Sequence, residues 1–246
     1  MILFGCQDKG PANYLSLLNQ GLKSETKWIG SELVKPYFSS QGFVIADLDL
    51  IYDNINLVVR GTCLEEGLDK ELLFEAKERR IKSVSIVDHW SWYHKRFVLD
   101  GQLLPPDFII LNDQTAVESA VLDGLPRNIL FPLGNPGLES LIYQRPFASL
   151  KNEVLAQFNL SNEKRTIVFV SEDLSVDFKK NTLDFLGYDE YDVLKIAQSA
   201  LSPKDQLVIK LNPAEDKNKY GELKLKDNVL ILDNLSFNRL SVLGDV

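Results

Sequence analysis

The stretch that decides the fold is residues 57–90, LVVRGTCLEEGLDKELLFEAKERRIKSVSIVDHW. Two short apolar runs in it, residues 57–59 and 84–87, predict buried strands. Between them, four apolar residues recur at the spacing of one helix face: Leu68, Leu72, Leu73 and Ala76. A strand, a helix and a second strand in this order form a βαβ unit, which makes the two strands parallel.

The same alternation of short apolar runs and amphipathic stretches extends over most of the chain. Further strands are predicted at residues 2–5, 28–29, 43–45, 108–111, 129–131, 166–170, 207–211 and 229–232. Helices are predicted between them at residues 12–22, 31–38, 115–122, 183–201 and 235–242. Such alternation joins parallel strands through helices that cover both faces of a sheet. The sequence therefore predicts an α/β protein with two Rossmann-like, doubly wound parallel-sheet domains, the second small or incomplete.

Prolines and a polar stretch that interrupt the alternation of strands and helices predict the domain boundaries. Pro136 and Pro146 interrupt two helical stretches, and residues 161–164 form a polar break. We therefore expect an N-terminal domain over residues 1–146, a helical linker over 147–162 and a partial C-terminal domain over 163–246. A three-stranded open sheet leaves an edge that proteins normally cover, which predicts a homodimer or a poorly ordered C-terminus.

Composition excludes several classes of protein. The 246 residues carry a formal net charge of −8, from 27 Lys and Arg against 35 Asp and Glu. Without clustered cations, nucleic acid is excluded as the main partner. No apolar run approaches the roughly 18 residues that span a bilayer, and the N-terminus is typical of a strand rather than a secretory signal. We expect a cytoplasmic protein that associates with membranes at most peripherally.

Chemistry is expected at the carboxyl ends of the strands, where doubly wound sheets bind ligands. The loop after the first strand offers four candidate substrate-binding residues, Gln7, Asp8, Gly10 and Asn13, whose backbone N–H groups can meet an anion or a sugar hydroxyl. Equally, this loop can be a plain turn. Thr62 and Asn135 follow two other strands and are further candidates for substrate binding, with an ordinary loop role as the alternative.

The densest group of functional side chains is residues 87–97, directly after a strand. Asp88 and His89 are the candidate catalytic residues, because a carboxylate beside an imidazole supports general-base chemistry near neutral pH. Aromatic faces with interleaved donors suit a carbohydrate or a nucleobase, and the candidates for binding one are Trp90, Trp92, His94 and Arg96. The alternative is an aromatic plug between domains, with Asp88 as a helix cap.

No metal site and no cofactor are predicted. His89 and His94 lack further ligands at a usable spacing, and Cys6 and Cys63 form neither a disulfide framework nor a zinc site. In the second half, three residues at strand ends can face a donor phosphate or hydroxyl, or lie on the surface: Glu172, Lys210 and Asn212.

Five segments carry a family resemblance: ILFGCQDKGPANYL (2–15), VVRGTC (58–63), SVSIVDHWSWYHKRF (83–97), PPDFIILND (105–113) and FPLGNPGLE (131–139). They resemble bacterial GT-B-type glycosyltransferases of cell-surface polysaccharide biosynthesis and their relatives, the sugar-nucleotide 2-epimerases and the glycerophosphate and sialic-acid polymer transferases. The resemblance implies an acceptor-binding N-terminal sheet and a nucleotide-sugar-binding C-terminal sheet. It also implies metal-independent transfer, with a nucleotide sugar and a glycan acceptor as partners.

The chain departs from this family in three places. The run 210–213 is Lys-Leu-Asn-Pro where polymer transferases often carry Lys-Leu-His-Pro, and the His-Arg-Glu-Asn signature of the epimerases is missing. A phosphate loop and an acidic ribose-binding residue would follow the position of residues 244–246, so we expect part of the donor site to be absent. The leading hypothesis is sugar or polyol-phosphate transfer, with Asp88 or His89 activating an acceptor hydroxyl. The alternatives are a non-catalytic sugar- or nucleotide-binding protein or remnant, and a sugar-nucleotide epimerase, which needs carboxylates on both faces of the sugar.

Overall fold

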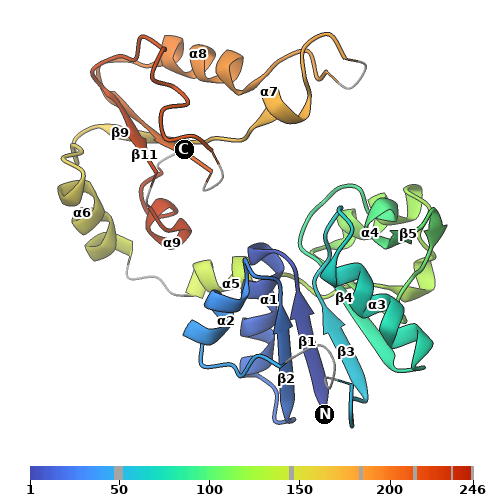
Figure 1. Ribbon diagram of the computed structural model, residues 1–246. Helices are drawn as coiled ribbons and strands as arrows, with labels where there is room; N and C mark the ends of the chain where they lie inside the picture. Colours follow the sequence, from blue (N-terminus) through green and yellow to red (C-terminus); the bar gives the residue numbers. More distant parts are fainter. Residues whose placement is uncertain (47–51, 144–146, 183–184, 213–214, 234, 245–246) are drawn as a thin grey trace. The chain divides into compact units, whose positions relative to one another are not determined.

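The chain folds into two compact units, Met1–Tyr143 and Gln144–Val246 (Figure 1). The computed structural model describes residues 1–46, 52–143, 147–182, 185–212, 215–233 and 235–244. Each unit is built on a parallel sheet with helices between its strands. This confirms the predicted fold class of two Rossmann-like α/β sheets.

The first unit contains a six-stranded parallel sheet in the order β2-β1-β3-β4-β7-β8. Its strands are β1 (Ile2–Cys6), β2 (Thr26–Gly30), β3 (Leu57–Arg60), β4 (Lys82–Val87), β7 (Phe108–Leu111) and β8 (Leu130–Pro132). The chain runs from β1 to one side to form β2, then crosses to the other side to form β3. The strand order therefore reverses between β1 and β3, the place where doubly wound sheets bind ligands.

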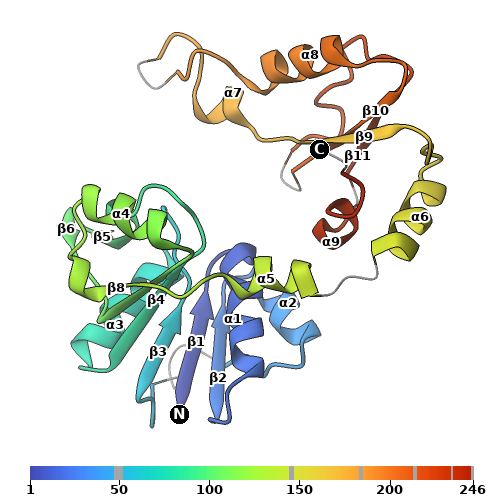
Figure 2. The ribbon, with the colours of Figure 1, turned by 180° about the vertical axis from the view of Figure 1, so that it is seen from behind.

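Helices cover both faces of this sheet because successive strand residues point to opposite sides. Phe4 packs with α1 (Lys9–Gln20) and α2 (Lys35–Ser40), whereas its neighbour Leu3 packs with α3 (Leu68–Glu78). On the side of α3, α4 (Gln114–Leu122) packs on β7 and β8. The views from opposite sides in Figures 1 and 2 show α1 and α3 on different faces of the sheet, and α5 (Pro136–Tyr143) lies beside α1.

The second unit contains a three-stranded parallel sheet in the order β11-β10-β9. Its strands are β9 (Arg165–Val170), β10 (Asp205–Lys210) and β11 (Val229–Leu232). On one face, Val208 packs with α6 (Phe147–Gln157) and α9 (Phe237–Leu240), and on the other, Leu207 packs with α8 (Glu190–Ala200). The short helix α7 (Leu174–Asp177) follows β9. The described helices include none with the length and hydropathy needed to cross a membrane.

Two predicted elements are wrong. Residues 43–45 form no strand: only Ile45 makes a single bridge, to Trp28, and the Phe43 ring instead stacks on the Trp28 ring at 3.9 Å. The helix predicted at 183–201 begins only at Glu190, after the capping box of Asp189, and residues 183–184 lie outside the described part. The sequence prediction also lacked the hairpin of β5 (Val98–Leu99) and β6 (Gln102–Leu103), which turns through left-handed Asp100 and Gly101.

Candidate functional site

The candidate site lies where β1 and β3 end side by side. The Gly61 N–H donates to the Gly5 carbonyl over 3.0 Å, which holds the loop after β3 against β1. The Gln7 side chain donates to the Cys63 thiol sulfur over 3.7 Å and packs against Gly67, where a Cβ would overlap the Gln7 amide. The loops that follow the two strands therefore form one connected edge, at the reversal of strand order.

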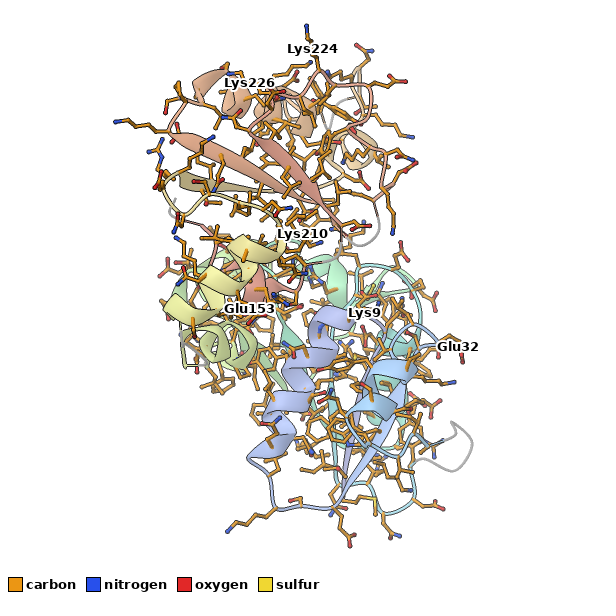
Figure 3. All side chains as sticks on the ribbon, turned by 90° about the vertical axis from the view of Figure 1, so that its left-hand side faces the viewer. Lys9, Glu32, Glu153, Lys210, Lys224 and Lys226 are labelled. Carbon is orange, nitrogen blue, oxygen red and sulfur yellow. The ribbon has the colours of Figure 1, made fainter. Side chains whose placement is uncertain are left out.

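Asp88 brings a carboxylate to this edge from the end of β4. A Cβ added to Gly10, in the first turn of α1, would lie 2.5 Å from Asp88 Oδ2, so the missing side chain leaves room for the carboxylate. Asp88 Oδ1 is buried and has no hydrogen-bond partner among the described residues. Figure 3 shows Lys9 at the same end of α1. An unpartnered carboxylate oxygen at a strand end is suited to meet a ligand.

Burial raises the pKa of Asp88. The positive charges of His89 and Arg96 oppose this rise in pKa, and the negative charge of Asp8 adds to it. His89 itself is exposed beside Asp88. A carboxyl group whose pKa lies above its usual value holds its proton more readily than a free carboxyl group, which suits it to proton transfer. Of the two predicted catalytic residues, Asp88 is therefore half-buried and His89 is exposed.

Arg60 and Asp69 are buried beneath this edge, and neither was among the predicted site residues. Arg60 Nη1 donates to the Asp69 carbonyl over 2.8 Å, and Asp69 Oδ1 accepts from the Gln7 N–H over 3.2 Å. Burial raises the pKa of Asp69 to about 7, against the opposing charge of Arg60. Burial lowers the pKa of Arg60 to about 10. Asp69 therefore links the start of α3 to the loop that carries Asp8.

Thr62 and Arg96, both predicted to bind substrate, make internal hydrogen bonds. The buried Thr62 hydroxyl donates to the Ile86 carbonyl over 3.1 Å. Arg96 Nη1 donates to the Thr62 carbonyl over 3.3 Å, and Arg96 Nε donates to the Ser91 carbonyl at the same distance. The two side chains thus fix the loops after β3 and β4 relative to one another.

Asn13 and Asn135 both lie beside Gly137, at the start of α5. Asn135 Oδ1 accepts from the Gly137 N–H over 2.9 Å, and Asn135 Nδ2 donates to Asn112 Oδ1 over 3.2 Å. A Cβ on Gly137 would lie 3.1 Å from Asn13 Nδ2. The predicted candidates Asn13 and Asn135 therefore belong to one group of amides.

The aromatic segment after Asp88 places two indole rings in contact with solvent. Trp90 and Trp92 are half exposed, and they line a groove of about 600 Å³ together with His94. The Trp90 indole donates to Asp113 Oδ2 over 2.7 Å, and the His94 backbone N–H donates to Asp123 Oδ2 over 2.8 Å. These three predicted binding residues share one groove.

Neither cysteine is poised to act as a nucleophile. Cys6 and Cys63 are free and buried, and burial raises the pKa of both thiols, for Cys63 to about 11. A thiol must ionise to attack, so both are inert at neutral pH. Within the ranges the structure describes, no group of three His, Cys, Asp or Glu side chains is arranged to hold a metal ion.

In the second unit, the predicted phosphate-binding residues lie at the ends of β9 and β10. Lys210 Nζ donates to the carbonyls of Leu211 and Asp233, and the Asn212 N–H donates to Glu215 Oε2 over 2.8 Å. Glu172 is exposed. The ammonium of Lys210 is therefore already engaged with backbone oxygens.

The sequence reasoning also missed a charged cluster around Lys219 in this unit. Lys219 Nζ lies 2.6 Å from Asp173, 2.8 Å from Glu190 and 2.7 Å from Glu215, and only 6% of its side chain is exposed. Burial by itself would lower the pKa of Lys219, but hydrogen bonds to the three carboxylates raise it well above its usual range. With one cation among three carboxylates, the cluster around Lys219 has a negative net charge.

Comparison with known proteins identifies solved structures that have a similar fold. No family model matches the sequence, and no curated protein matches it. The UDP-GlcNAc 2-epimerase from Neisseria meningitidis bound to UDP-GlcNAc is similar, with a TM-score of 0.66, 13% identity and coverage of 98% of this chain and 74% of that one. Anabaena HepE in complex with UDP-glucose gives a TM-score of 0.68, 12% identity and coverage of 99% and 72%.

A third similar structure is the Methanocaldococcus jannaschii UDP-GlcNAc 2-epimerase in complex with UDP-GlcNAc and UDP. It gives a TM-score of 0.61, 11% identity and coverage of 98% of this chain and 75% of that one. At these identities the likeness shows the fold alone. The chain has the two-domain, Rossmann-like architecture of GT-B-type proteins, as the sequence resemblance implied.

Proposed function

We propose that this chain binds a UDP-activated sugar and that Asp88 moves a proton on that sugar. The similar structures named above hold UDP-GlcNAc, UDP or UDP-glucose. The observation that carries the proposal is the Asp88 carboxyl group at the end of β4. Its Oδ1 is buried and has no hydrogen-bond partner within the part of the chain that the structure describes, and its Oδ2 occupies the space that Gly10 leaves free. Proton transfer by such a carboxyl group is the chemistry that this position supports best.

Epimerisation is the reaction we favour. Inverting a sugar carbon that bears hydrogen requires removal of a proton from one face and its return to the other. A carboxyl group with a raised pKa can do either step. Asp8, whose charge raises the pKa of Asp88, follows β1 at the same edge. Asp8 and Asp88 are therefore our proposal for the pair of carboxyl groups that epimerisation needs.

Sugar transfer is the second candidate, and the groove of Trp90 and Trp92 favours it because transfer requires a binding place for an acceptor. In a transferase, Asp88 or His89 would take the proton of the acceptor hydroxyl. Lys210 and Asn212 remain proposed contacts for the diphosphate. For Lys210, this requires that its ammonium exchange a carbonyl for a phosphate oxygen.

Binding is tested first, by calorimetry and by the shift in melting temperature with UDP, UDP-GlcNAc, UDP-glucose and CDP. We expect the uridine compounds to bind and stabilise the protein. Next, UDP-GlcNAc is incubated with protein in D2O and followed by NMR. Deuterium at carbon 2 supports epimerisation, whereas UDP release that depends on an added saccharide supports transfer.

Variants assign the role of Asp88. Asp88→Asn should lower turnover at least 100-fold while UDP affinity stays within a few-fold of that of the unaltered protein. Asp53→Asn, the same change at an exposed position of the first unit, should change neither. If millimolar UDP and UDP-sugars give neither heat nor a shift in melting temperature, the proposed function is wrong.

A further inference from the structure

The short loop between β1 and α1 carries Asp8, the second carboxyl group of the proposed reaction. Asp8 stands directly before α1 with an extended backbone, yet its side chain makes no capping hydrogen bond among the described residues. An aspartate in this position usually accepts a hydrogen bond from the first turn of its helix. Its carboxylate instead lies beside the Cys63 thiol: burial raises the pKa of Cys63, and a hydrogen bond with Asp8 adds to the rise. The hold on Asp8 therefore comes through the rest of the loop.

Gln7, the residue before Asp8, is held by side chains from two other segments of the first unit. The Ser31 hydroxyl, after β2, donates to the Gln7 carbonyl over 2.6 Å. The Gln7 N–H donates to Asp69 Oδ1, at the start of α3, over 3.2 Å. The peptide group that joins Gln7 to Asp8 is therefore fixed by Ser31, and the peptide group before it is fixed by Asp69.

Two glycines let the start of α3 approach this loop. A Cβ on Gly5, in β1, would lie 2.5 Å from Leu72 Cδ1, so the missing side chain allows α3 to pack directly on the strand. Gly67, just before α3, has a φ of +144°, and a Cβ there would overlap the Gln7 side-chain amide. This close approach brings Asp69, the second residue of α3, within hydrogen-bond distance of the Gln7 N–H.

A carboxyl group in this position is unfavourable for the stability of the fold. Asp69 is 0% exposed, and its Oδ2 has no hydrogen-bond partner in the part of the chain that the structure describes. Burial without a partner costs free energy, more so for a charged group. Glu71, in the same turn of α3, is exposed, as an acidic residue at a helix start usually is. A residue that opposes stability while it holds a loop of the candidate site is typical of a functional position.

We propose that Asp69 is a positioning residue for the reaction: through the Gln7 N–H it holds the loop so that Asp8 lies at the same edge as Asp88. This inference rests on the proposed function, in which Asp8 and Asp88 are the two carboxyl groups. Epimerisation needs both groups at fixed places around one sugar carbon, and a misplacement of about 1 Å lowers a rate on the order of 100-fold. Because Asp69 acts by accepting one hydrogen bond, asparagine can take its place and an apolar residue cannot.

Kinetics of two variants separate positioning from folding. Asp69→Leu should lower kcat for deuterium uptake at carbon 2 of UDP-GlcNAc by about tenfold or more, while the affinity and the stoichiometry of UDP binding, measured by calorimetry, stay as in the unaltered protein. A protein that had only lost stability would lose UDP-binding sites along with turnover. Asp69→Asn keeps the acceptor and should retain kcat to within about threefold. Glu71→Leu, in the same turn but exposed, is the matched control and should change neither quantity.

A double-variant cycle tests whether Asp69 acts through Asp8. In the Asp8→Asn protein no carboxyl group is left to misplace, so Asp69→Leu should lower kcat there by less than about twofold. An equal loss of kcat with and without the Asp8 carboxyl group would overturn the proposal.

Two further measurements need no substrate. In the unaltered protein, hydrogen exchange followed by NMR should show the Gln7 amide protected to the same extent as the amides within β1. Cys6 and Cys63 are the two cysteines of the chain, and both are buried beside Gln7. Their labelling by a thiol reagent therefore reports opening of the loop, and Asp69→Leu should speed it by about tenfold or more, whereas Asp69→Asn should leave it unchanged.

The outcomes distinguish this inference from the proposed function. A Gln7 amide that exchanges as fast as an unprotected one overturns the inference, even where Asp69→Leu does not fold. Equal kcat values for Asp69→Leu and Asp69→Asn, or equal labelling rates, overturn it as well. Absence of UDP binding to the unaltered protein would overturn the proposed function and this inference with it, whereas the other results overturn this inference alone.

Discussion

Replacing Gly10 by alanine tests the placement of the Asp88 carboxylate. The new Cβ would lie 2.5 Å from Asp88 Oδ2, whereas ordinary contacts begin at 3.4 Å. The carboxylate must therefore move by nearly 1 Å, and misplacement on this scale costs a reaction on the order of 100-fold in rate. Because the displaced atom ends a side chain rather than lying in the backbone, the fold can adapt.

The same change should leave the stability of the protein nearly unchanged. Gly10 lies in the first turn of α1, and alanine gains up to about 1 kcal/mol over glycine within a helix. We expect Gly10→Ala to have an unfolding free energy within about 1 kcal/mol of the unaltered protein, because the helical gain offsets the displacement of Asp88. Turnover of the UDP-sugar should nevertheless fall by at least tenfold. Loss of activity without loss of stability is the expected signature.

Urea denaturation and turnover are measured on four proteins: unaltered, Gly10→Ala, Asp88→Ala and the double variant. Without the carboxylate, Gly10→Ala should stabilise by up to about 1 kcal/mol. Gly21→Ala, at the C-terminal end of α1, serves as control because its Cβ would make only ordinary contact, 3.7 Å from the Leu18 carbonyl. Equal effects of Gly10→Ala with and without Asp88 would refute the contact, and full activity of Gly10→Ala would refute the role of Asp88.

Three further changes test the charged groups at the edge of the first unit and in the cluster around Lys219 of the second unit. Asp69→Asn should stabilise increasingly as pH rises, by up to about 1.4 kcal/mol per unit between about pH 4 and 7. Over this range Asp69 ionises in the unfolded protein but keeps its proton in the folded protein, where its pKa is about 7. Urea midpoints at several pH values measure the difference, and a difference that does not change with pH would contradict the prediction. Lys219→Met should destabilise by about 3–5 kcal/mol because it leaves buried carboxylates unpaired, whereas Lys217→Met, at an exposed ion pair, should change denaturation little. Asp8→Asn should lower turnover at least tenfold, because Asp8 is the proposed second carboxyl group. The pH profile of the remaining turnover should move to lower pH, since the change removes a charge that raises the pKa of Asp88, and an unmoved profile would argue against that coupling.

Local pattern was enough to predict the architecture. Strand and helix periodicities alternate along the chain, and this alternation by itself requires parallel strands with helical crossovers. Where side-chain packing decided the outcome, the prediction failed. Phe43 is as apolar as a strand residue, yet its ring stacks on Trp28 instead of joining the sheet. Helix α8 starts at Glu190 because Asp189 caps it, a stronger signal than the apolar residues before it.

Candidate site residues were predictable only where position after a strand identified them. Asp88 follows an apolar run directly, so the sequence places it at the ligand edge. Asp69 stands in the first turn of a helix, where an acidic residue is usually a favourable partner of the helix dipole on the surface. Its burial arises from tertiary contacts with Gln7 and Arg60, which are nine or more residues distant in sequence. Likewise, Lys219 gathers carboxylates from up to 46 residues away, which no local pattern records.

The charges at the edge of the first unit bear on which part of the proposed ligand, a UDP-sugar, would lie there. Three carboxyl groups, those of Asp8, Asp69 and Asp88, influence one another there, and two guanidinium groups, of Arg60 and Arg96, oppose them. Arg60 is fully buried and Arg96 donates to backbone carbonyls. Neither guanidinium is therefore presented to a diphosphate, whose charges the carboxylates would repel. A neutral sugar carries no such penalty, and its hydroxyl groups can donate to Asp88 Oδ1. Under the proposed function, we therefore expect the sugar, and not the diphosphate, to be the part of the ligand that meets Asp88.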